Sequence, residues 1–414
     1  MRNKPRIRFK GFTEDWEQRK LISLYKTIRN AFVGTATPYY TNDSINGYFY
    51  LESNNVKNGK INRNNEIYIT KDFYQKQEDK LLYKDDIVIV QSGHVGHTAV
   101  IPEELDKTAA HALIMLQNKK ENFDSLFINN SFQTPLIRNK IDEITTGNTI
   151  KHILASDVKT IVINMPSFKE QKLISQLFKL LDLNITLHQR KLEKLKIAKK
   201  ALLQKLFPKN GSQFPEIRFK GFTDAWEQRK LSDISTKVTT KNVDVHYTET
   251  LTNSAEQGII SQVDFFDKEI SNKDNINGYY IVDNNDFIYN PRISTLAPVG
   301  PINRNKLNRT GIMSPLYTVF RSSNVDLDFL EWYFQSSHWH RYMKLNGDSG
   351  ARADRIAIKD STFFEMPIKI PVNIKEQVLI GETLEKFNQY ITLHQCKLDK
   401  LQDVKKGLLQ KMFV

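Results

Sequence analysis

Apolar side chains recur every three or four residues along residues 169–207, which predicts one continuous helix with a single apolar stripe. The stretch contains no proline, and its leucine, lysine, glutamine and alanine content favours a helix. At ~1.5 Å per residue the stripe would run roughly 50 Å, which is too long to be covered by one small domain. The helix therefore needs an equally long apolar partner.

The chain itself contains such a partner, because the same stretch recurs at residues 375–413 with an offset of 206 positions. We predict that the two helices pack against each other as an intramolecular, antiparallel coiled coil. The seam positions expected to face the partner helix are Ile185, His188, Leu192, Leu195, Leu202, Ile391, His394, Leu398, Leu401 and Leu408. Polar residues also recur on the stripe, as His188 with His394 and Lys199 with Lys405. They can fix the register of the pair, or the lysines can extend to solvent and the histidines hydrogen-bond locally.

A second repeat opens each half of the chain. Residues 5–21 return as 215–231, with fourteen of the seventeen positions identical. The segments that follow, 26–160 and 236–365, are unlike each other, and a proline- and glycine-containing link at 207–215 ends the first long helix. We expect a first globular domain at 1–168, a long helix at 169–207, a second globular domain at 208–374 and a C-terminal long helix at 375–414. The two halves should be related by a pseudo-twofold axis.

The dissimilar segments mix short apolar runs with turn residues, which predicts α+β (α/β-like) domains. The expected strands are 67–70, 86–90, 160–164, 279–282, 286–289 and 367–370. Residues 326–343, rich in Leu, Phe, Trp and Tyr, predict one buried helix.

The charge of the chain narrows the class of partner. Its 60 Lys and Arg exceed its 47 Asp and Glu, giving a formal net charge of +13, which suits nucleic acid or an anionic membrane surface. The single cysteine excludes an internal disulfide and a cysteine-rich zinc site. Neither a signal peptide nor a membrane-spanning stretch is recognisable, so we expect a cytoplasmic protein with no membrane partner.

The order of these repeats resembles the specificity subunit of a type I restriction-modification system. The resemblance covers essentially the whole chain and depends on the duplicated openings 9–16 (FKGFTEDW) and 219–226 (FKGFTDAW), on a proline before each Glu-Gln helix start, and on the two long helices. The second helix start has one residue more between Pro371 and Glu376 than the first has between Pro166 and Glu170. The resemblance implies a non-catalytic subunit that reads a bipartite site in double-stranded DNA. Its two target-recognition domains would be 1–168 and 208–374, and the helices 169–207 and 375–414 would be the spacer.

The resemblance also implies the partners. Two methyltransferase subunits would modify adenine N6 with S-adenosylmethionine, and two ATP-dependent restriction subunits would complete the enzyme with Mg²⁺. No cofactor is then expected in this chain. Two other readings stay open: a free-standing nuclease or methyltransferase with an unrecognised site, and a coiled-coil scaffold that binds only proteins.

Motifs for chemistry within the chain are weak. No glycine-rich GxxxxGK[ST] loop is present, so ATP binding is not expected. Asn290-Pro-Arg-Ile293 only partly matches the Asn-Pro-Pro-Tyr signature of adenine methyltransferases. His94 and His97 have a spacing that suits metal ligation on a helix, but the intervening glycines predict a loop, and we expect no metal site. His338 beside Trp339 is expected to pack in the aromatic helix.

Arginine and lysine suit guanine, and asparagine and glutamine suit adenine, so loop residues of these types are the candidate DNA contacts. Some of them would contact phosphates rather than bases. The candidates are Asn54, Asn55, Lys57, Gln91, His94, Thr146, Asn148, Thr149, Lys151, Arg292, Arg304, Asn305, Lys306, Arg309, Arg352 and Arg355. The central stretch 169–211 carries eleven Lys and Arg against three Asp and Glu, which could place it near DNA or an acidic partner surface.

Overall fold

The computed structural model describes residues 4–149, 151–209, 211–266, 273–348 and 354–414. It divides into two compact units: unit 1 is formed by Met1–Gln189 with Cys396–Val414, and unit 2 by Arg190–Gln395. Each unit therefore contains one of the two dissimilar segments together with half of each long helix.

Unit 1 contains two four-stranded sheets and two short strand pairs. Its described strands are β1 (Glu17–Lys20), β2 (Tyr25–Asn30), β3 (Tyr40–Thr41), β4 (Tyr48–Leu51), β5 (Val56–Lys57), β6 (Lys60–Ile61), β7 (Ile67–Ile69), β8 (Ile87–Val90), β9 (Thr98–Val100), β10 (Ala109–Ala110), β11 (Leu113–Lys119) and β12 (Val162–Met165). The short helices are α1 (Leu21–Leu24), α2 (Lys71–Gln75), α3 (Ser125–Ser131), α4 (Pro135–Ile144) and α5 (Ala155–Val158). The central sheet has the order β2-β11-β8-β9 and is antiparallel throughout, and the second sheet has the order β10-β4-β7-β3.

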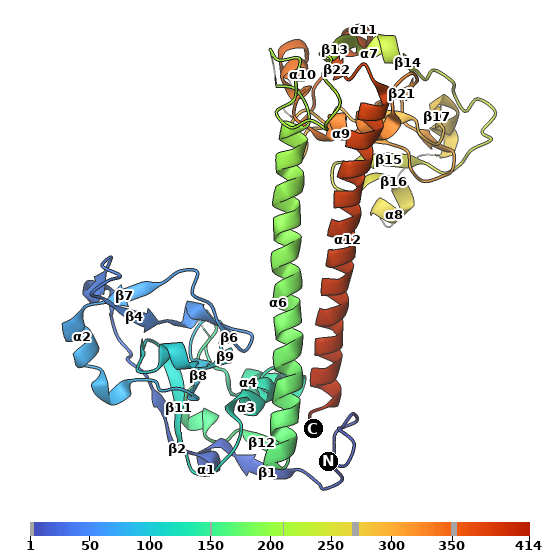
Figure 1. Ribbon diagram of the computed structural model, residues 1–414. Coiled ribbons are helices and arrows are strands. Elements are labelled where there is room, and N and C mark those ends of the chain that lie inside the picture. The colour runs from blue at the N-terminus through green and yellow to red at the C-terminus, as the bar shows by residue number, and fades with distance from the viewer. Residues whose placement is uncertain (1–3, 150, 210, 267–272, 349–353) are drawn as a thin grey trace. The chain divides into compact units, whose positions relative to one another are not determined.

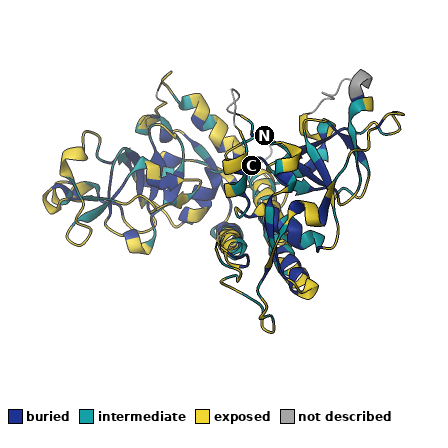
Figure 2. Ribbon diagram, turned by 90° about the horizontal axis from the view of Figure 1, so that it is seen from above, coloured by how far each residue is buried: buried dark blue, intermediate teal, exposed yellow. Residues whose placement is uncertain are grey.

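The central sheet of unit 1 is buried on both faces, which explains the uninterrupted apolar run of β8. Ile87 and Ile89 belong to the core formed with α3, α4 and the start of the long helix α6 (Phe168–Lys205), whereas Val88 and Val90 belong to a core on the other face. Side chains alternate along a strand, so a strand covered on both sides is apolar throughout. Figure 2 shows buried segments in dark blue in the interior and exposed segments in yellow around them.

The described residues of unit 2 form one four-stranded sheet and three strand pairs. The strands are β13 (Glu227–Lys230), β14 (Ser235–Lys237), β15 (Leu251–Ser254), β16 (Gly258–Ser261), β17 (Tyr280–Val282), β18 (Phe287–Tyr289), β19 (Ile302–Arg304), β20 (Gly311–Met313), β21 (Thr318–Ser322) and β22 (Pro367–Ile370). The short helices are α7 (Leu231–Ile234), α8 (Gln262–Phe266), α9 (Leu327–Gln335), α10 (His340–Asn346) and α11 (Asp360–Phe364). The central sheet has the order β14-β21-β18-β19, and Phe287 and Ile288 on β18 point into different cores.

The predicted strands are confirmed as β7, β8, β12, β17, β18 and β22, each within two residues of the expected ends. The single helix predicted at 326–343 is wrong, because two helices, α9 and α10, occupy this stretch. Ser336 ends α9 in an extended conformation, and its hydroxyl donates to the Tyr333 carbonyl at 2.5 Å. A serine that bonds locally to the backbone competes with helix continuation, and apolar periodicity does not reveal this.

The two repeated stretches are the helices α6 and α12 (Ile374–Lys411), each 38 residues long. Within unit 1, Lys405 Nζ lies 2.7 Å from Asp182 Oδ1. Within unit 2, Lys199 Nζ lies 2.9 Å from Asn388 Oδ1. The start of α6 therefore lies beside the end of α12, and the end of α6 beside the start of α12, so the predicted antiparallel pair is confirmed (Figure 1).

These two contacts are equivalent under the 206-residue offset, since Lys199 corresponds to Lys405 and Asp182 to Asn388. All ten predicted seam positions are shielded from solvent. Ile185, Leu192, His394 and Leu398 are buried, and His188, Leu195, Leu202, Ile391, Leu401 and Leu408 are partly buried. The stripe read from the sequence is thus the covered side of both helices.

The duplicated opening and the duplicated helix start form one repeated contact. Arg8 binds the buried Glu170 carboxylate through two hydrogen bonds of 2.7 and 2.8 Å, and Arg218 binds Glu376 at 2.7 and 2.9 Å. A bidentate arginine is the geometry that best matches a carboxylate removed from water. The next residue in each helix, Gln171 or Gln377, accepts a hydrogen bond from the backbone N–H of Asp124 or Asp326, at 3.0 and 2.9 Å.

Those two aspartates in turn cap α3 and α9, because their side chains accept hydrogen bonds from Phe127 N and Phe329 N. The Glu-Gln pair at each helix start therefore joins the opening segment to the capped helix of the same unit. The openings also pair as strands with the segment just before each long helix, β1 with β12 and β13 with β22.

The C-terminal end of α12 packs into the core of unit 1, and the C-terminal end of α6 packs into the core of unit 2. Phe413 packs edge-on against Trp16 with ring centroids 6.1 Å apart, and Phe207 packs against Trp226 at 6.2 Å. The backbone N–H of Ile7 donates to Lys411 O at 2.9 Å, and that of Ile217 donates to Lys205 O at 3.0 Å. Both units are therefore built on the same frame, which consists of the opening segment, one helix start and one helix end.

Candidate nucleic-acid interface

A tight hairpin presents the first candidate residues of unit 1. Strands β5 and β6 are joined by Asn58 and Gly59, both with positive φ (50° and 82°), which is the Asn-Gly turn preferred in two-residue hairpins. The hairpin leaves the Lys57 side chain exposed. Asn54 is also exposed, in the short 3₁₀ turn that precedes β5.

The loop between β8 and β9 lies against this hairpin. Gly93 and Gly96 adopt positive φ (77° and 80°), so the segment is a loop and not a helix, as its glycines predict. His94 is exposed, whereas His97 is partly buried and its Nδ1 accepts a hydrogen bond from Asn58 N at 3.3 Å. The hairpin and the histidine loop, about forty residues apart in sequence, are thereby joined.

The third group is a turn closed by Thr146 and His152, whose backbones exchange hydrogen bonds of 2.9 and 2.8 Å. Gly93 N donates to Lys151 O at 3.2 Å, and Ile153 N donates to Gln91 O at 3.1 Å, so this turn lies beside the histidine loop. The structure thus brings together the candidates Gln91, His94, Thr146, Asn148, Thr149 and Lys151. All of these are exposed except Gln91, which is partly buried.

Arg138, on the exposed side of α4, is a residue that our sequence reasoning missed. It donates hydrogen bonds to Gln133 Oε1 at 3.0 Å and to Asn58 Oδ1 at 3.5 Å. We searched loops for DNA contacts, and Arg138 lies within a helix. Its exposed position on an amphipathic helix next to a turn is the signal that could have found it.

The electrostatic field at this face is positive. The pKa of His97 lies below its ordinary value, first because of burial and then because Arg138, His94 and Lys57 disfavour a further positive charge. Near pH 7 the ring is therefore neutral, and it can accept the hydrogen bond from Asn58.

Two predicted contacts, Asn55 and Asn305, are buried inside their loops. The Asn55 amide donates to the carbonyls of Asn62 and Asn65 at 2.9 and 3.2 Å, and its oxygen accepts from Glu52 N at 3.0 Å. The Asn305 amide donates to the carbonyls of Asp283 and Arg309, both at 3.0 Å. Both side chains hold the loop backbone, so we withdraw them as base-reading candidates.

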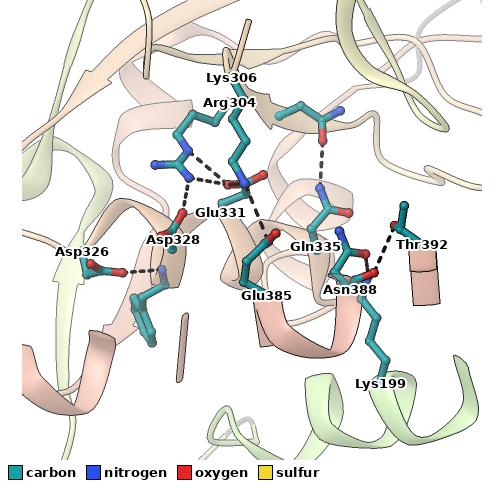
Figure 3. Close-up of polar contacts among 12 residues, drawn as sticks. Lys199, Arg304, Lys306, Asp326, Asp328, Glu331, Gln335, Glu385, Asn388 and Thr392 are labelled. Atoms are coloured by element: carbon teal, nitrogen blue, oxygen red, sulfur yellow. Dashed lines mark hydrogen bonds and ion pairs between the residues drawn. The ribbon is translucent and has the colours of Figure 1, made fainter. Parts of the chain in front are cut away.

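Arg304 is also held inside unit 2 (Figure 3). Its side chain is 8% exposed and forms ion pairs with Asp328 and with Glu331, the latter at 2.8 Å. Lys306 is more exposed, but its Nζ lies 2.7 Å from the same Glu331. Asp328, Glu331 and Glu385 thus form ion pairs with Arg304 and Lys306. Arg304 is therefore also withdrawn as a DNA contact.

Arg292, which is exposed, and Arg355, which is partly buried, remain as candidates in unit 2. Their backbones form an isolated antiparallel bridge, and each Nε lies 3.8 Å from Asp354 Oδ2. The Arg292 side chain is 70% exposed. Arg309 lies apart from them, where it binds Glu249 through two hydrogen bonds of 2.8 and 2.7 Å. Arg352 lies outside the described residues.

Comparison with known proteins gives the family. Residues 13–197 match the type I restriction modification DNA specificity domain. The type I restriction enzyme MjaVIII specificity subunit of Methanocaldococcus jannaschii is 22% identical, over 96% of this chain and 91% of its own. Residues 13–197 therefore form a type I restriction-modification DNA specificity domain, and nearly the whole chain is similar to a specificity subunit of such a system.

Solved structures from type I restriction-modification systems show the same fold as this chain. The S subunit of the type I restriction-modification system from M. genitalium superposes with a TM-score of 0.60 at 14% identity, covering 99% of both chains. A chain from a study of complex assembly and conformational transition of the type I system gives a TM-score of 0.50 at 14% identity, covering 95% of this chain and 96% of that one.

The remaining sequence motifs of the chain are part of its fold. The Asn290 amide donates to Asn253 O at 2.9 Å, and its oxygen accepts from Arg292 N at 3.0 Å. His338 bonds Ser336 Oγ at 2.9 Å and packs beside Phe207. In the described part of the chain, no three His, Cys, Asp or Glu side chains converge as metal ligands, and no helix is long and apolar enough to cross a membrane.

Proposed function

We propose that this specificity subunit reads a bipartite site in double-stranded DNA, with one part of the site read by each unit. The observation that carries the proposal is the repetition of one frame around two different sets of loops. Arg8–Glu170 and Arg218–Glu376 have nearly identical geometry, whereas the loop residues differ: unit 1 has histidine and amide loops, and unit 2 has the paired Arg292 and Arg355. A constant frame with variable loops suits a protein that reads two unlike sequences.

We further propose that other subunits perform the chemistry. Two methyltransferase subunits would use S-adenosylmethionine to modify adenine N6, and two restriction subunits would use ATP and Mg²⁺. The subunit itself would be non-catalytic and hold no cofactor. The long helices would keep the two reading units at a fixed separation, and their exposed surfaces would be available to the partner subunits.

The test compares the purified chain with the assembled enzyme. Incubated alone with DNA and S-adenosylmethionine, the chain should transfer no methyl group, and transfer should begin when methyltransferase subunits are added. In the host, deleting the chain should remove methylation at one bipartite motif. Methyl transfer by the chain alone, or an unchanged methylation pattern after deletion, would contradict the proposal.

A further inference from the structure

A wide groove in unit 1 lies between the β5/β6 hairpin, α4 and the last turns of α12. Its volume is about 1080 Å³, and it also borders the middle of α6. Five basic side chains line it, from four different elements: Lys57, Lys60, Arg138, Lys405 and Lys406. The lining includes two acidic residues, Asp142 and Asp182, so basic groups exceed acidic ones by three.

Much of this positive charge is not neutralised within the fold. Asp182 binds both Lys60 at 3.1 Å and Lys405 at 2.7 Å, which leaves one excess charge in that cluster. Lys57, Arg138 and Lys406 are exposed, and none of them forms an ion pair with another described residue. An open groove with unpaired cations and little negative charge is suited to an anionic ligand.

The uncharged lining also favours nucleic acid over protein. Seven of the seventeen lining residues are asparagine or glutamine, and only Pro135, Ile185 and Leu409 are apolar. The buried centres of protein–protein interfaces are depleted in lysine, whereas four lysines line this groove. Amides and lysines are instead the groups that bind phosphate oxygens along a DNA backbone.

The groove is continuous with the recognition loops. Asn58 lines the groove, and its backbone N–H donates a hydrogen bond to His97 Nδ1. The Asn58 side-chain oxygen accepts a hydrogen bond from Arg138 at 3.5 Å. A duplex read by the histidine loop and the Thr146–His152 turn would therefore extend its backbone toward Lys57, Arg138 and Lys406.

We propose that this groove binds the sugar-phosphate backbone of DNA beside the half-site of unit 1, with α12 contributing affinity that does not depend on sequence. The inference rests on the proposed function and assigns part of the DNA-binding surface to the repeated frame. In unit 2 the equivalent of Lys405 is Lys199, which lies over the Trp332 ring at 4.5 Å and beside the acidic cluster of Glu331 and Glu385 (Figure 3). The counterpart of Lys405 is therefore engaged by other groups of unit 2.

The test measures DNA affinity over a range of salt concentrations, with the subunit assembled with its methyltransferase partners. The probes are a duplex carrying the methylated motif found in the host and a scrambled duplex of equal length. Lys406→Gln and Arg138→Gln should each weaken binding to both probes by about five- to tenfold near 0.1 M salt, and each should lower the salt slope by about one. Lys397→Gln, an exposed lysine of α12 outside the groove, is the matched control and should change neither quantity.

The outcomes separate the two proposals. The first outcome is that both groove variants keep the DNA affinity and salt slope of the wild type, while the wild-type subunit binds DNA normally. This result would overturn the proposal that the groove binds DNA and would leave the proposed function intact. Loss of the methyltransferase subunits from the groove variants, with unchanged DNA affinity in the assembled fraction, would also overturn it, because the groove would then bind protein. A wild-type assembly without salt-sensitive DNA binding would refute the proposed function itself.

Discussion

Loop residues with the same chemistry have opposite roles in this chain, depending on burial. Asn305 is fully buried and Arg304 is 8% exposed, and both are held by groups of unit 2. Arg292, in another loop of the same unit, is largely exposed, and Asp354 at 3.8 Å is a weak partner. Removing a buried charged partner destabilises the fold, whereas removing an exposed one costs little stability.

We therefore expect Arg304→Met and Arg292→Gln to have separate effects. Arg304→Met should lower the free energy of unfolding of unit 2 by about 2 kcal/mol, because Asp328 and Glu331 lose a partner. Tryptophan fluorescence measures this well, since Trp226, Trp332 and Trp339 lie in unit 2 and only Trp16 lies in unit 1. Arg292→Gln should leave the unfolding midpoint unchanged and weaken DNA binding. If Arg292→Gln lowered the unfolding midpoint and Arg304→Met did not, burial would not distinguish structural residues from DNA contacts.

Histidine makes unit 2 sensitive to acid. Burial, followed by Lys344 and His338, lowers the pKa of His340 from 6.5 to about 4, and burial and Lys369 lower the pKa of His338. The unfolded chain therefore binds protons that the folded unit does not. The contribution of the neutral His340 to the free energy of unfolding is fully present above about pH 6.5 and is lost as the pH falls toward 4. His340→Phe should flatten the fluorescence-monitored midpoint over this range relative to wild type. An unchanged pH profile would contradict the assignment.

At the scale of elements, the two ends of the helix pair differ in one charge. Lys405 faces the carboxylate of Asp182, whereas Lys199 faces the neutral amide of Asn388. Burial lowers the pKa of Lys199, which shows that its ammonium group lacks full compensation. The cation–π contact with Trp332 offsets part of this cost.

Exchanging the two partners should therefore shift stability in opposite directions. Asn388→Asp should stabilise the helix pair in unit 2 by about 1 kcal/mol, and Asp182→Asn should destabilise it in unit 1 by a similar amount. Hydrogen exchange of the α6 and α12 backbone amides would report each unit separately. If protection in unit 2 fell for Asn388→Asp, repulsion from Glu385 would outweigh the new pair.

The sequence predicted the elements whose cause is local or periodic. The long helices, their seam and the apolar strands follow from spacing alone, since each residue's burial depends on the same repeat. The contacts of the repeated frame could not be predicted from the sequence, because Arg8 and Glu170 are 162 residues apart and nothing in either segment identifies the other as its partner. The candidate DNA-contacting face was predicted only in part for the same reason, because Lys57 on β5, Arg138 on α4 and the loop residues His94 and Thr146 come from separate parts of the sequence.

For the whole molecule, the length of the paired helices should set the spacing of the two half-sites. Seven residues inserted after Gln189 and seven after Gln395, which are equivalent positions, would preserve the stripe and lengthen both helices by ~10 Å. The gap in the methylated motif should then grow by about three base pairs at ~3.4 Å each. Insertion into α6 alone is the control and should disrupt the pair. An unaltered gap would exclude a spacer role for the helices.

The central claim is that one frame carries two independent readers. Replacing residues 26–160 with the corresponding segment of another specificity subunit, and mapping methylated adenines across the host genome, tests it most directly. We predict that one half of the bipartite motif changes, while the other half and the gap stay the same. A motif that changes in both halves, or in neither, would contradict the account.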